Sequence, residues 1–336
     1  MTDVLTTATD GAAVQAGRAS PPAAQGRFRS LLATAGRLVK NTALLVYLYG
    51  GYVPLRDWTR GLLGRPRLVV LTYHRVGSRD VLSKPTEEFR RDLQYLKRHY
   101  ECIRLVDLHD RLCSGAPIKR PIAVVTFDDG YRDNFTEAVP VLLEEKVPAT
   151  FFVATGFVET ERDFPHDLRA DRSRGDGAPA RRFPKLTWND LLQMEAAGFE
   201  IGSHTVNHTD LGGASQATVS RELVHSLLTL NTMLGPRRRA FSFPWGKPEN
   251  MSECAFTIAR QLGYYAVASA CGGANRRRGT LFHIRRVDAG NGHLSPLAFC
   301  ARVAGLDPEY WRIWLRQLPL PGWIGHQSQR GRDPHA

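Results

Sequence analysis

Short apolar runs alternate with amphipathic segments along most of the chain, a pattern typical of strands alternating with helices. The runs that have the length of buried strands lie at 67–74, 122–127, 149–153, 199–202, 240–243 and 265–269. Apolar residues at helical spacing predict helices at 87–99, 138–146, 187–196, 217–234 and 251–262. This order predicts a parallel sheet with crossover helices, and we expect about seven strands in all, which is enough to close a barrel.

The two ends of the chain differ in composition from its middle. Residues 1–26 are rich in Ala, Thr, Gly and Pro and are expected to be disordered, as is the tail at 319–336. The first residues lack the charged start and apolar centre of a secretory signal, so a cytoplasmic or membrane-associated location is favoured over export. We expect a basic, partly apolar extension at 27–66 and one barrel domain at 67–318.

The extension allows two interpretations. Residues 27–67 hold eight Arg or Lys residues and a single acid, Asp57. The apolar part, 43–55, is too short to cross a bilayer and contains Gly50, Gly51 and Pro54. It is either a basic amphipathic segment that lies on a membrane surface or a helical extension that packs on the flank of the domain.

The net charge is +12, and much of it lies in the arginine clusters 181–182, 237–239, 276–278 and 285–286. No nucleic-acid motif accompanies these clusters, so we interpret most of them as solvated loops, with acidic glycan or lipid headgroups as less favoured partners. The five cysteines are odd in number and scattered, without a Cys-x-x-Cys. They predict buried, inert thiols rather than disulfides or a thiolate zinc site.

Two polar motifs follow predicted strands: the pair Asp128-Asp129 and, further along, His204 with His208. Taken alone, the first is more typical of a turn or helix cap, and the second of surface histidines. Together they are more informative, because polar residues at the carboxyl ends of parallel strands converge in an α/β barrel. One carboxylate with two imidazoles binds a divalent metal and leaves positions open, and the second carboxylate is then a candidate base.

These motifs stand among others whose order matches a family of carbohydrate enzymes. The matching segments are VVTFDDG at 124–130, ATFFV at 149–153, LTW at 186–188, GFEIGSH at 198–204 with His208, and FSFPWG at 241–246. Over roughly residues 68–290 the chain resembles the polysaccharide deacetylase family, also called the chitooligosaccharide deacetylase homology domain or carbohydrate esterase family 4. The resemblance implies a distorted (β/α)7 TIM-like barrel that removes N-acetyl groups from amino sugars in a polysaccharide, oligosaccharide or glycolipid precursor.

The resemblance assigns Asp129, His204 and His208 as metal ligands and Asp128 as the general base. Zinc is the expected ion, with Co2+, Ni2+ or Mn2+ as alternatives. Such an ion keeps net positive charge beside one carboxylate and two imidazoles, and it can polarise an amide carbonyl. The base takes a proton from the attacking water, and the resemblance suggests the backbone N–H of Trp245 as a donor to the oxyanion.

The general acid departs from the common pattern of the family. Many members take it from a late Leu-x-His strand, which this chain lacks, since His293 has the wrong context. The strand that ends in Tyr73-His74 instead resembles a rearranged branch that includes biofilm poly-N-acetylglucosamine deacetylases. We expect His74 to be the acid, because a polar residue that leaves a buried barrel strand usually points into the site; the alternative is a structural histidine.

A second departure concerns the base. Many relatives hold the base carboxylate with an arginine at the position of Ser242, which cannot form an ion pair. Asp128 is therefore expected to be oriented by another group or to lie in a looser site. The polar stretch 158–185 lies near the predicted mouth, where it forms either a lid or substrate rim or a disordered insertion.

Substrate contacts are expected from Tyr131, Pro244, Trp245, Gly246 and Asp288. Trp245 is either a groove wall against a sugar face or a core residue. Asp288 either orients the candidate acid or lies at the rim.

The leading interpretation is an N-deacetylase of polysaccharides or oligosaccharides, with an N-acetylated glycan as partner and no nucleic acid. One alternative is a non-catalytic carbohydrate-binding member, although all four motif residues are present. Another is a membrane-surface partner of a polysaccharide assembly system, suggested by residues 27–67. The sequence does not indicate the oligomeric state.

Overall fold

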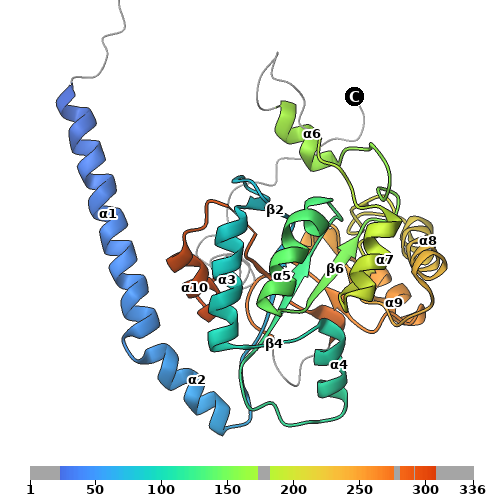
Figure 1. Cartoon of the computed structure of the whole chain (residues 1–336), viewed down its shortest axis with the longest axis horizontal. Coiled ribbons are helices and arrows are strands. Elements are labelled where there is room, and N and C mark those ends of the chain that lie inside the picture. Colours follow the sequence, from blue (N-terminus) through green and yellow to red (C-terminus); the bar gives the residue numbers. More distant parts are fainter. Residues whose placement is uncertain (1–22, 173–181, 276–280, 291, 308–336) are drawn as a thin grey trace, which may run out of the picture. The chain divides into compact units, whose positions relative to one another are not determined.

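A computed structural model describes residues 23–172, 182–275, 281–290 and 292–307 (Figure 1). The tail expected to be disordered at 319–336, and residues 1–22 of the N-terminal stretch, lie outside this part. The chain divides into two units, Met1–Leu44 and Leu45–Ala336. The second unit contains the predicted barrel.

The core of the second unit is a parallel sheet of eight strands. Seven follow the order β10-β1-β5-β6-β7-β8-β9, and the short β4 (Glu101–Cys102) pairs with β5. Their bounds are β1 (Leu68–Tyr73), β5 (Ile122–Phe127), β6 (Ala149–Val153), β7 (Glu200–Ser203), β8 (Phe241–Ser242), β9 (Val267–Ala268) and β10 (Val287–Asp288). All of their pairings are parallel, as the alternation predicted.

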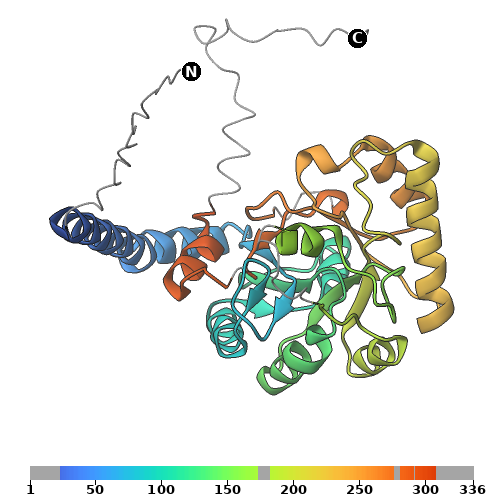
Figure 2. The ribbon, with the colours of Figure 1, turned by 90° about the horizontal axis from the view of Figure 1, so that it is seen from above.

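One short segment brings the two edges of this sheet together. Ile284 forms a parallel bridge with Ala268 of β9, and Val287, three residues later, pairs with Leu71 of β1. The sheet therefore curls back on itself, and the predicted (β/α) barrel is confirmed (Figure 2). The strand at 287–288 that completes it was not predicted.

Helices cover the outside of the sheet. The predicted ones are present as α3 (Thr86–His99), α5 (Val139–Glu145), α7 (Trp188–Ala196), α8 (Gln216–Leu234) and α9 (Glu253–Gln261). Those not predicted are α4 (Leu105–Cys113), α6 (Pro165–Arg172) and α10 (Pro296–Ala304), and a π-helical turn, Asn134–Ala138, precedes α5. Thr187 caps α7 as expected, since its side chain accepts a hydrogen bond from the N–H of Asp190.

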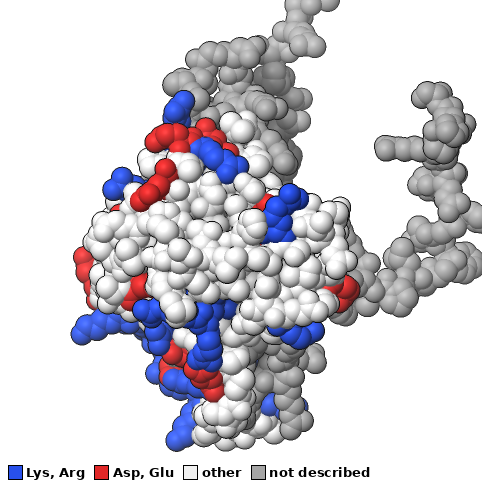
Figure 3. All heavy atoms as spheres, turned by 90° about the vertical axis from the view of Figure 1, so that its right-hand side faces the viewer, with Lys and Arg blue, Asp and Glu red and all other residues white. Residues whose placement is uncertain are grey.

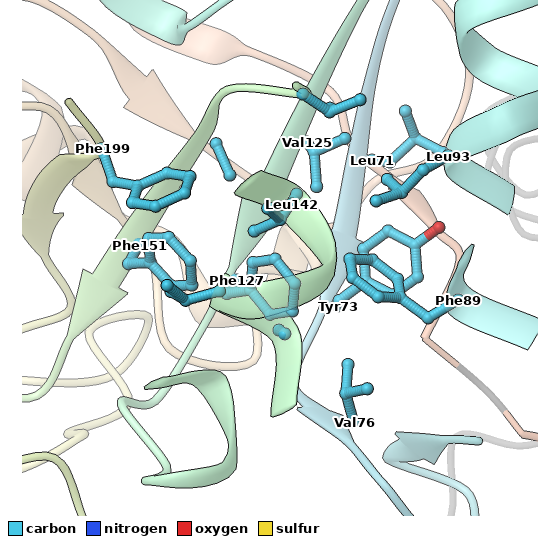
Figure 4. Close-up of a cluster of buried hydrophobic side chains, with 14 of the residues drawn as sticks. Leu71, Tyr73, Val76, Phe89, Leu93, Val125, Phe127, Leu142, Phe151 and Phe199 are labelled. Carbon is cyan, nitrogen blue, oxygen red and sulfur yellow. The ribbon is translucent and has the colours of Figure 1, made fainter. Parts of the chain in front are cut away.

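Alternate residues of the strands face two different cores. Figure 4 shows the outer one, in which Tyr73, Phe127 and Phe151 pack in a row against Phe89 and Leu142 of the covering helices. The stacked rings of Phe127 and Phe151 lie 4.8 Å apart. The intervening residues, such as Val70, Val124 and Phe152, form a second cluster inside the barrel. This alternation decides which residues just beyond each strand point into the mouth.

The extension contains two helices, α1 (Ala23–Tyr49) and α2 (Tyr52–Leu62). From Leu45 onward it belongs to the barrel unit, where Arg56 Nη1 and the Tyr47 hydroxyl donate to the carbonyl oxygen of Ala304 at 2.7 and 3.1 Å. Among the described residues, no helix combines the length and the apolar character that crossing a bilayer requires.

Charged side chains of both signs are interspersed on the face shown in Figure 3, around a broad uncharged area. The interpretation of the arginine clusters as solvated holds for Arg237 and Arg238, which are exposed. It is wrong for Arg239 and Arg286, which are buried with 2% and 1% of their surface exposed. Arg239 is held by the part-buried Glu195 and by the carbonyl of Ile201.

The cysteines differ from the expectation of uniformly buried thiols. All five are free, as predicted, but only Cys271 is buried, and Cys113 is exposed at the end of α4. The polar stretch at 158–185 also contains α6, although residues 173–181 lie outside the described part.

Candidate metal centre and active site

Five side chains enter the mouth of the barrel because they continue the inward alternation of five strands. They are His74 after β1, Asp128 after β5, His204 after β7, Ser242 at the end of β8, and Arg286 before β10. Each lies two residues beyond an inward-facing residue of the same segment: Thr72, Thr126, Gly202, Ala240 and Ile284, respectively. The N–H of Asp128 still donates to the carbonyl of Tyr73 at 2.9 Å, which holds β1 and β5 together at the site.

Asp129 lies at the centre of a group of histidines. Its Oδ1 is 3.2 Å from Nε2 of His208 and 3.5 Å from Nε2 of His204, while its Oδ2 is 3.5 Å from Nε2 of His166. One ligand atom each from Asp129, His166 and His208 lies within 4.8 Å of the others. The predicted ligands Asp129 and His208 thus form a group that could hold a metal together with His166, which was not predicted. His204 lies beside Oδ1 of Asp129 but is not part of this group.

The surroundings of Asp129 fit a divalent cation. The residue is 2% exposed, and neither carboxylate oxygen has a hydrogen-bond partner within the described part of the protein. Burial alone would raise the pKa of Asp129, but the nearby imidazole rings of His204, His208 and His166 hold that pKa well below its usual value. A buried, ionised carboxylate without such partners would be unstable, so the chemistry of the donor set suits a cation.

The tautomer of His204 also suits a ligand. Its Nδ1 lies 2.8 Å from the carbonyl oxygen of Ser242. Because a carbonyl can only accept, Nδ1 carries the proton, and in the neutral ring Nε2 directs its lone pair toward Asp129. The carbonyl of Ser242 thus orients the His204 ring in the way that the predicted role of His204 as a ligand requires.

The loop between the two predicted histidine ligands is held by a buried glutamate of α8. Glu222 accepts hydrogen bonds at 2.8 Å from the N–H groups of Val206 and Asn207 and from the side chain of Asn207. Thr205 and His208 have φ values of 67° and 54°, in the left-handed region. Asp129 and Trp245, with φ of 75° and 61°, share this conformation, so the site is built on unusual backbone.

Arg286 orients the second carboxylate, Asp128. Its Nη1 and Nη2 donate to Oδ1 and Oδ2 of Asp128 at 2.6 and 2.7 Å, and Nη2 also donates to Oγ of Ser242 at 2.7 Å. Ser242 stands where many relatives are expected to have an arginine, and its short side chain leaves the room that the Arg286 guanidinium occupies. The possibility of a looser site around Asp128 is therefore wrong.

The charges around Asp128 favour its ionised form. Burial alone would raise the pKa of Asp128, but the Arg286 guanidinium and the His204 ring outweigh it and hold that pKa below its usual value. An electrostatic contribution from His74 also lowers the pKa of Asp128, and it adds to the burial that lowers the pKa of His166. His74 is half-buried, and Asn134 of the π-helical turn donates to its backbone oxygen at 2.7 Å.

The predicted substrate-contact residues lie in different environments. Pro244 and Gly246 are buried, whereas Trp245 is half-buried and its ring centroid lies 5.2 Å from that of His208. Tyr131 is buried beside the predicted metal ligands, and burial, Asp129 and Asp167 raise its pKa well above the usual value. Asp288 is exposed, and its carboxylate contacts Arg302 of α10 at 3.4 Å.

Sequence reasoning missed His166 and Arg286. His166 lies in a polar stretch without periodicity, and no spacing links it to Asp129. Arg286 was hidden in a basic cluster, but it follows Ile284 at the inward spacing of a strand, and that alternation was the available signal.

Comparisons with known proteins agree with this geometry. The family model described as polysaccharide deacetylase matches residues 115–267. The Bacillus subtilis (strain 168) protein YxkH is 25% identical over 242 residues, which cover 71% of this chain and 77% of that protein. The poly-beta-1,6-N-acetyl-D-glucosamine N-deacetylase of Escherichia coli (strain K12) is 23% identical over 180 residues, which cover 51% of this chain and 26% of that protein.

A solved structure shares the fold. The Streptococcus pyogenes deacetylase PplD in complex with acetate superposes with a TM-score of 0.57 at 21% identity, covering 70% of this chain and 98% of that one.

Proposed function

The chain belongs to the polysaccharide deacetylase family, and from this premise we propose that it is a metal-dependent hydrolase that removes N-acetyl groups from an N-acetylated glycan. The observation that carries the proposal is the buried carboxylate of Asp129, whose two oxygens lack hydrogen-bond partners beneath a group of imidazole rings. Asp129, His204 and His208 would hold a divalent ion, with zinc favoured by this donor set. Such an ion, when bound, supplies a Lewis acid that polarises an amide carbonyl.

The other residues of the site supply the proton transfers. Water attacks the acetamide carbon, and a carboxylate oxygen of Asp128 accepts its proton while Arg286 holds that carboxylate in place. The N–H of Trp245 donates a hydrogen bond to the oxyanion that develops. His74 then gives a proton to the nitrogen as the C–N bond breaks, so that acetate and a free amine leave.

We propose a polymer or oligomer of N-acetylated hexosamine as the substrate class. The E. coli relative is named for poly-beta-1,6-N-acetyl-D-glucosamine, and a half-buried Trp245 beside the ligands offers an aromatic face for a sugar ring.

Acetate release from N-acetylglucosamine oligomers tests this proposal. We expect turnover with bound Zn2+ or Co2+, loss of turnover after chelation, and recovery when metal is added back. His204→Ala should lose bound metal and activity together, whereas His225→Ala, a change of an exposed histidine on α8, should keep both. Metal-loaded wild-type protein that releases no acetate from any N-acetylated oligomer would contradict the proposal.

We also propose that α2 contacts an anionic membrane surface. Tyr52, Leu55, Trp58 and Leu62 form one stripe of this helix, and each is between 58% and 69% exposed. The inner side of α2 instead carries Arg56, which binds the carbonyl of Ala304. A helix that turns apolar residues outward reverses the usual pattern of a core-facing helix.

The charge of this region selects the kind of surface. Arg60 and Arg65 are exposed near the apolar stripe, and Asp57 is the one acid of residues 27–67. Apolar residues flanked by arginines bind bilayers that contain anionic lipids.

Vesicle co-sedimentation tests this contact. Binding should be stronger to phosphatidylglycerol vesicles than to phosphatidylcholine vesicles and should weaken in high salt. The double substitution Leu55→Ser and Trp58→Ser should reduce binding, while Leu228→Ser, on the exposed face of α8, should not. Equal binding to both lipids, or a stripe that instead mediates self-association in solution, would refute it.

A further inference from the structure

We propose that His166 is a fourth protein ligand of the divalent ion, beside Asp129, His204 and His208. This inference rests on the metal-dependent function proposed above, but it concerns the composition of the metal site and is tested without measuring turnover.

His166 approaches Asp129 from a different side than the other histidines do. His204 and His208 both lie next to Oδ1 of the carboxylate, whereas Nε2 of His166 lies 3.5 Å from Oδ2. The ring centroids of His166 and His208 are 5.4 Å apart, close to the 5.0 Å between His204 and His208. His166 therefore meets the same carboxylate as the other two rings but from the side of Oδ2, and its ligand atom lies within 4.8 Å of those of Asp129 and His208.

The ring of His166 is held in this position by its neighbours. It stacks on Phe164 with centroids 5.3 Å apart and an interplanar angle of 8°, and Trp245 meets it edge-on at 5.6 Å. Phe164 stacks in turn on Phe157 at 4.1 Å and is fully buried. A rigid aromatic support of this kind fixes a ligand before metal arrives, which lowers the cost of ordering it.

The hydrogen bond between His166 and Tyr131 is the main alternative role. The Tyr131 hydroxyl lies 2.7 Å from Nε2 of His166, but it also donates to Oδ2 of Asp167 at 2.8 Å. A hydroxyl has one proton, and Asp167 provides the better acceptor for it. Tyr131 therefore keeps a partner when Nε2 turns its lone pair to a cation.

A fourth ligand changes what the site does with metal. When an ion has three protein ligands, water fills its remaining coordination positions on one side. Four protein ligands hold the ion more tightly. Because His166 lies at the start of α6, outside the strand ends that supply the other ligands, bound metal would also tie this segment to the mouth of the barrel.

Cobalt binding tests the proposal directly. His166→Ala should weaken Co2+ binding, measured by competition with a chelator, by at least about 10–100-fold, the loss that even outer partners of ligands produce. The visible bands of bound Co2+ should shift, because the ligand set changes. His225→Ala serves as the matched control and should leave both measurements unchanged.

Tyr131→Phe separates a ligand from a hydrogen-bond partner. This change removes the hydroxyl beside His166 and should leave the affinity for Co2+ and its spectrum close to those of the wild type. If Tyr131→Phe weakens binding as much as His166→Ala does, His166 acts only through Tyr131 and the proposal is overturned.

A measurement on the unaltered protein removes any dependence on the variants. In the NMR spectrum of the Co2+ form, each ligated histidine gives a hyperfine-shifted, exchangeable ring N–H signal. Three such signals are expected, and two would overturn the proposal. Deacetylation with only two signals would refute the fourth ligand alone, whereas three signals without deacetylation would refute the proposed function alone.

Discussion

Replacing Arg286 tests how much the protein depends on one buried ion pair. The side chains of Arg286 and Asp128 are 1% and 5% exposed, and the pair is bidentate. Arg286→Met removes the guanidinium but keeps most of the side-chain volume, so Asp128 remains as a buried carboxylate without its main partner. The carbonyl of Ser269 and the hydroxyl of Ser242 also lose a donor.

The expected loss is large relative to the stability of the fold. Removing one partner of a buried pair costs about 3–5 kcal/mol in the free energy of unfolding, within a typical total of about 5–15 kcal/mol. Arg286→Lys keeps the positive charge but cannot contact both oxygens at once, so its loss should be smaller.

Chemical denaturation followed by circular dichroism measures these losses. Arg238→Met is the matched control, because Arg238 also forms a bidentate pair, with Asp110 at 2.9 Å, but both side chains are more than half exposed. Solvent screens that pair, so the control should unfold like the wild type. Acetate release by folded Arg286→Met should also fall, through a lower kcat, because the carboxylate base loses its orientation.

The reasoning also predicts how two changes combine. In Arg286→Met the added substitution Asp128→Asn removes the stranded charge, so the double variant should be more stable than the sum of the single losses implies, by about 1–3 kcal/mol. The reasoning would be refuted if Arg286→Met lowered the free energy of unfolding by less than about 1 kcal/mol, or if the losses of the two single variants simply added in the double variant. Either result would show that the pair does not support the fold as its burial implies.

Three further changes test the remaining roles. Asp128→Asn should retain metal and reduce turnover by about 100-fold or more, and near-normal deacetylation would remove its role as the base. His74→Ala should keep the metal content and lose the high-pH limb of the rate profile, whereas an unaltered profile would point to another acid. Glu200 accepts a hydrogen bond from the Tyr265 hydroxyl. Burial raises the pKa of Glu200 above its usual value, so the native protein retains a proton on Glu200 that the unfolded protein releases. Relative to Glu200→Gln, the stability of the wild type should therefore fall as pH rises above about 4.3, and an equal pH dependence would contradict this.

The barrel was predictable because its strands are buried on both faces and its helices are amphipathic, so each leaves a period in the sequence. The proximity of Asp128 and His204 could be predicted from the same pattern, because strand ends converge in a parallel barrel. The shortest strands gave weaker signals, and the strand at 287–288 gave none. Two residues cannot show an alternation.

The site residues that the sequence did not predict, Arg286 and His166, depend on contacts between segments that lie far apart in the chain. Arg286 meets Asp128 across 158 positions of sequence, and apart from its spacing from the inward-facing Ile284 nothing near Arg286 distinguishes it from a solvated arginine. His166 is placed by the stacking of Phe157 and Phe164, in a stretch where hydrophobic spacing has no period. Sequence patterns report local burial well, but they do not report which buried charge finds which partner.

The left-handed backbone at the site sets a limit on how this protein can evolve. Asp129, Thr205, His208 and Trp245 each hold a conformation that costs a non-glycine residue about 1 kcal/mol or more, and Thr205 is β-branched, which makes it the most unfavourable of the four. Substitutions to glycine or asparagine would relieve this strain. Selection for heat resistance alone would therefore favour changes at the very positions that shape the proposed metal site, so stability and the proposed activity compete at the same residues.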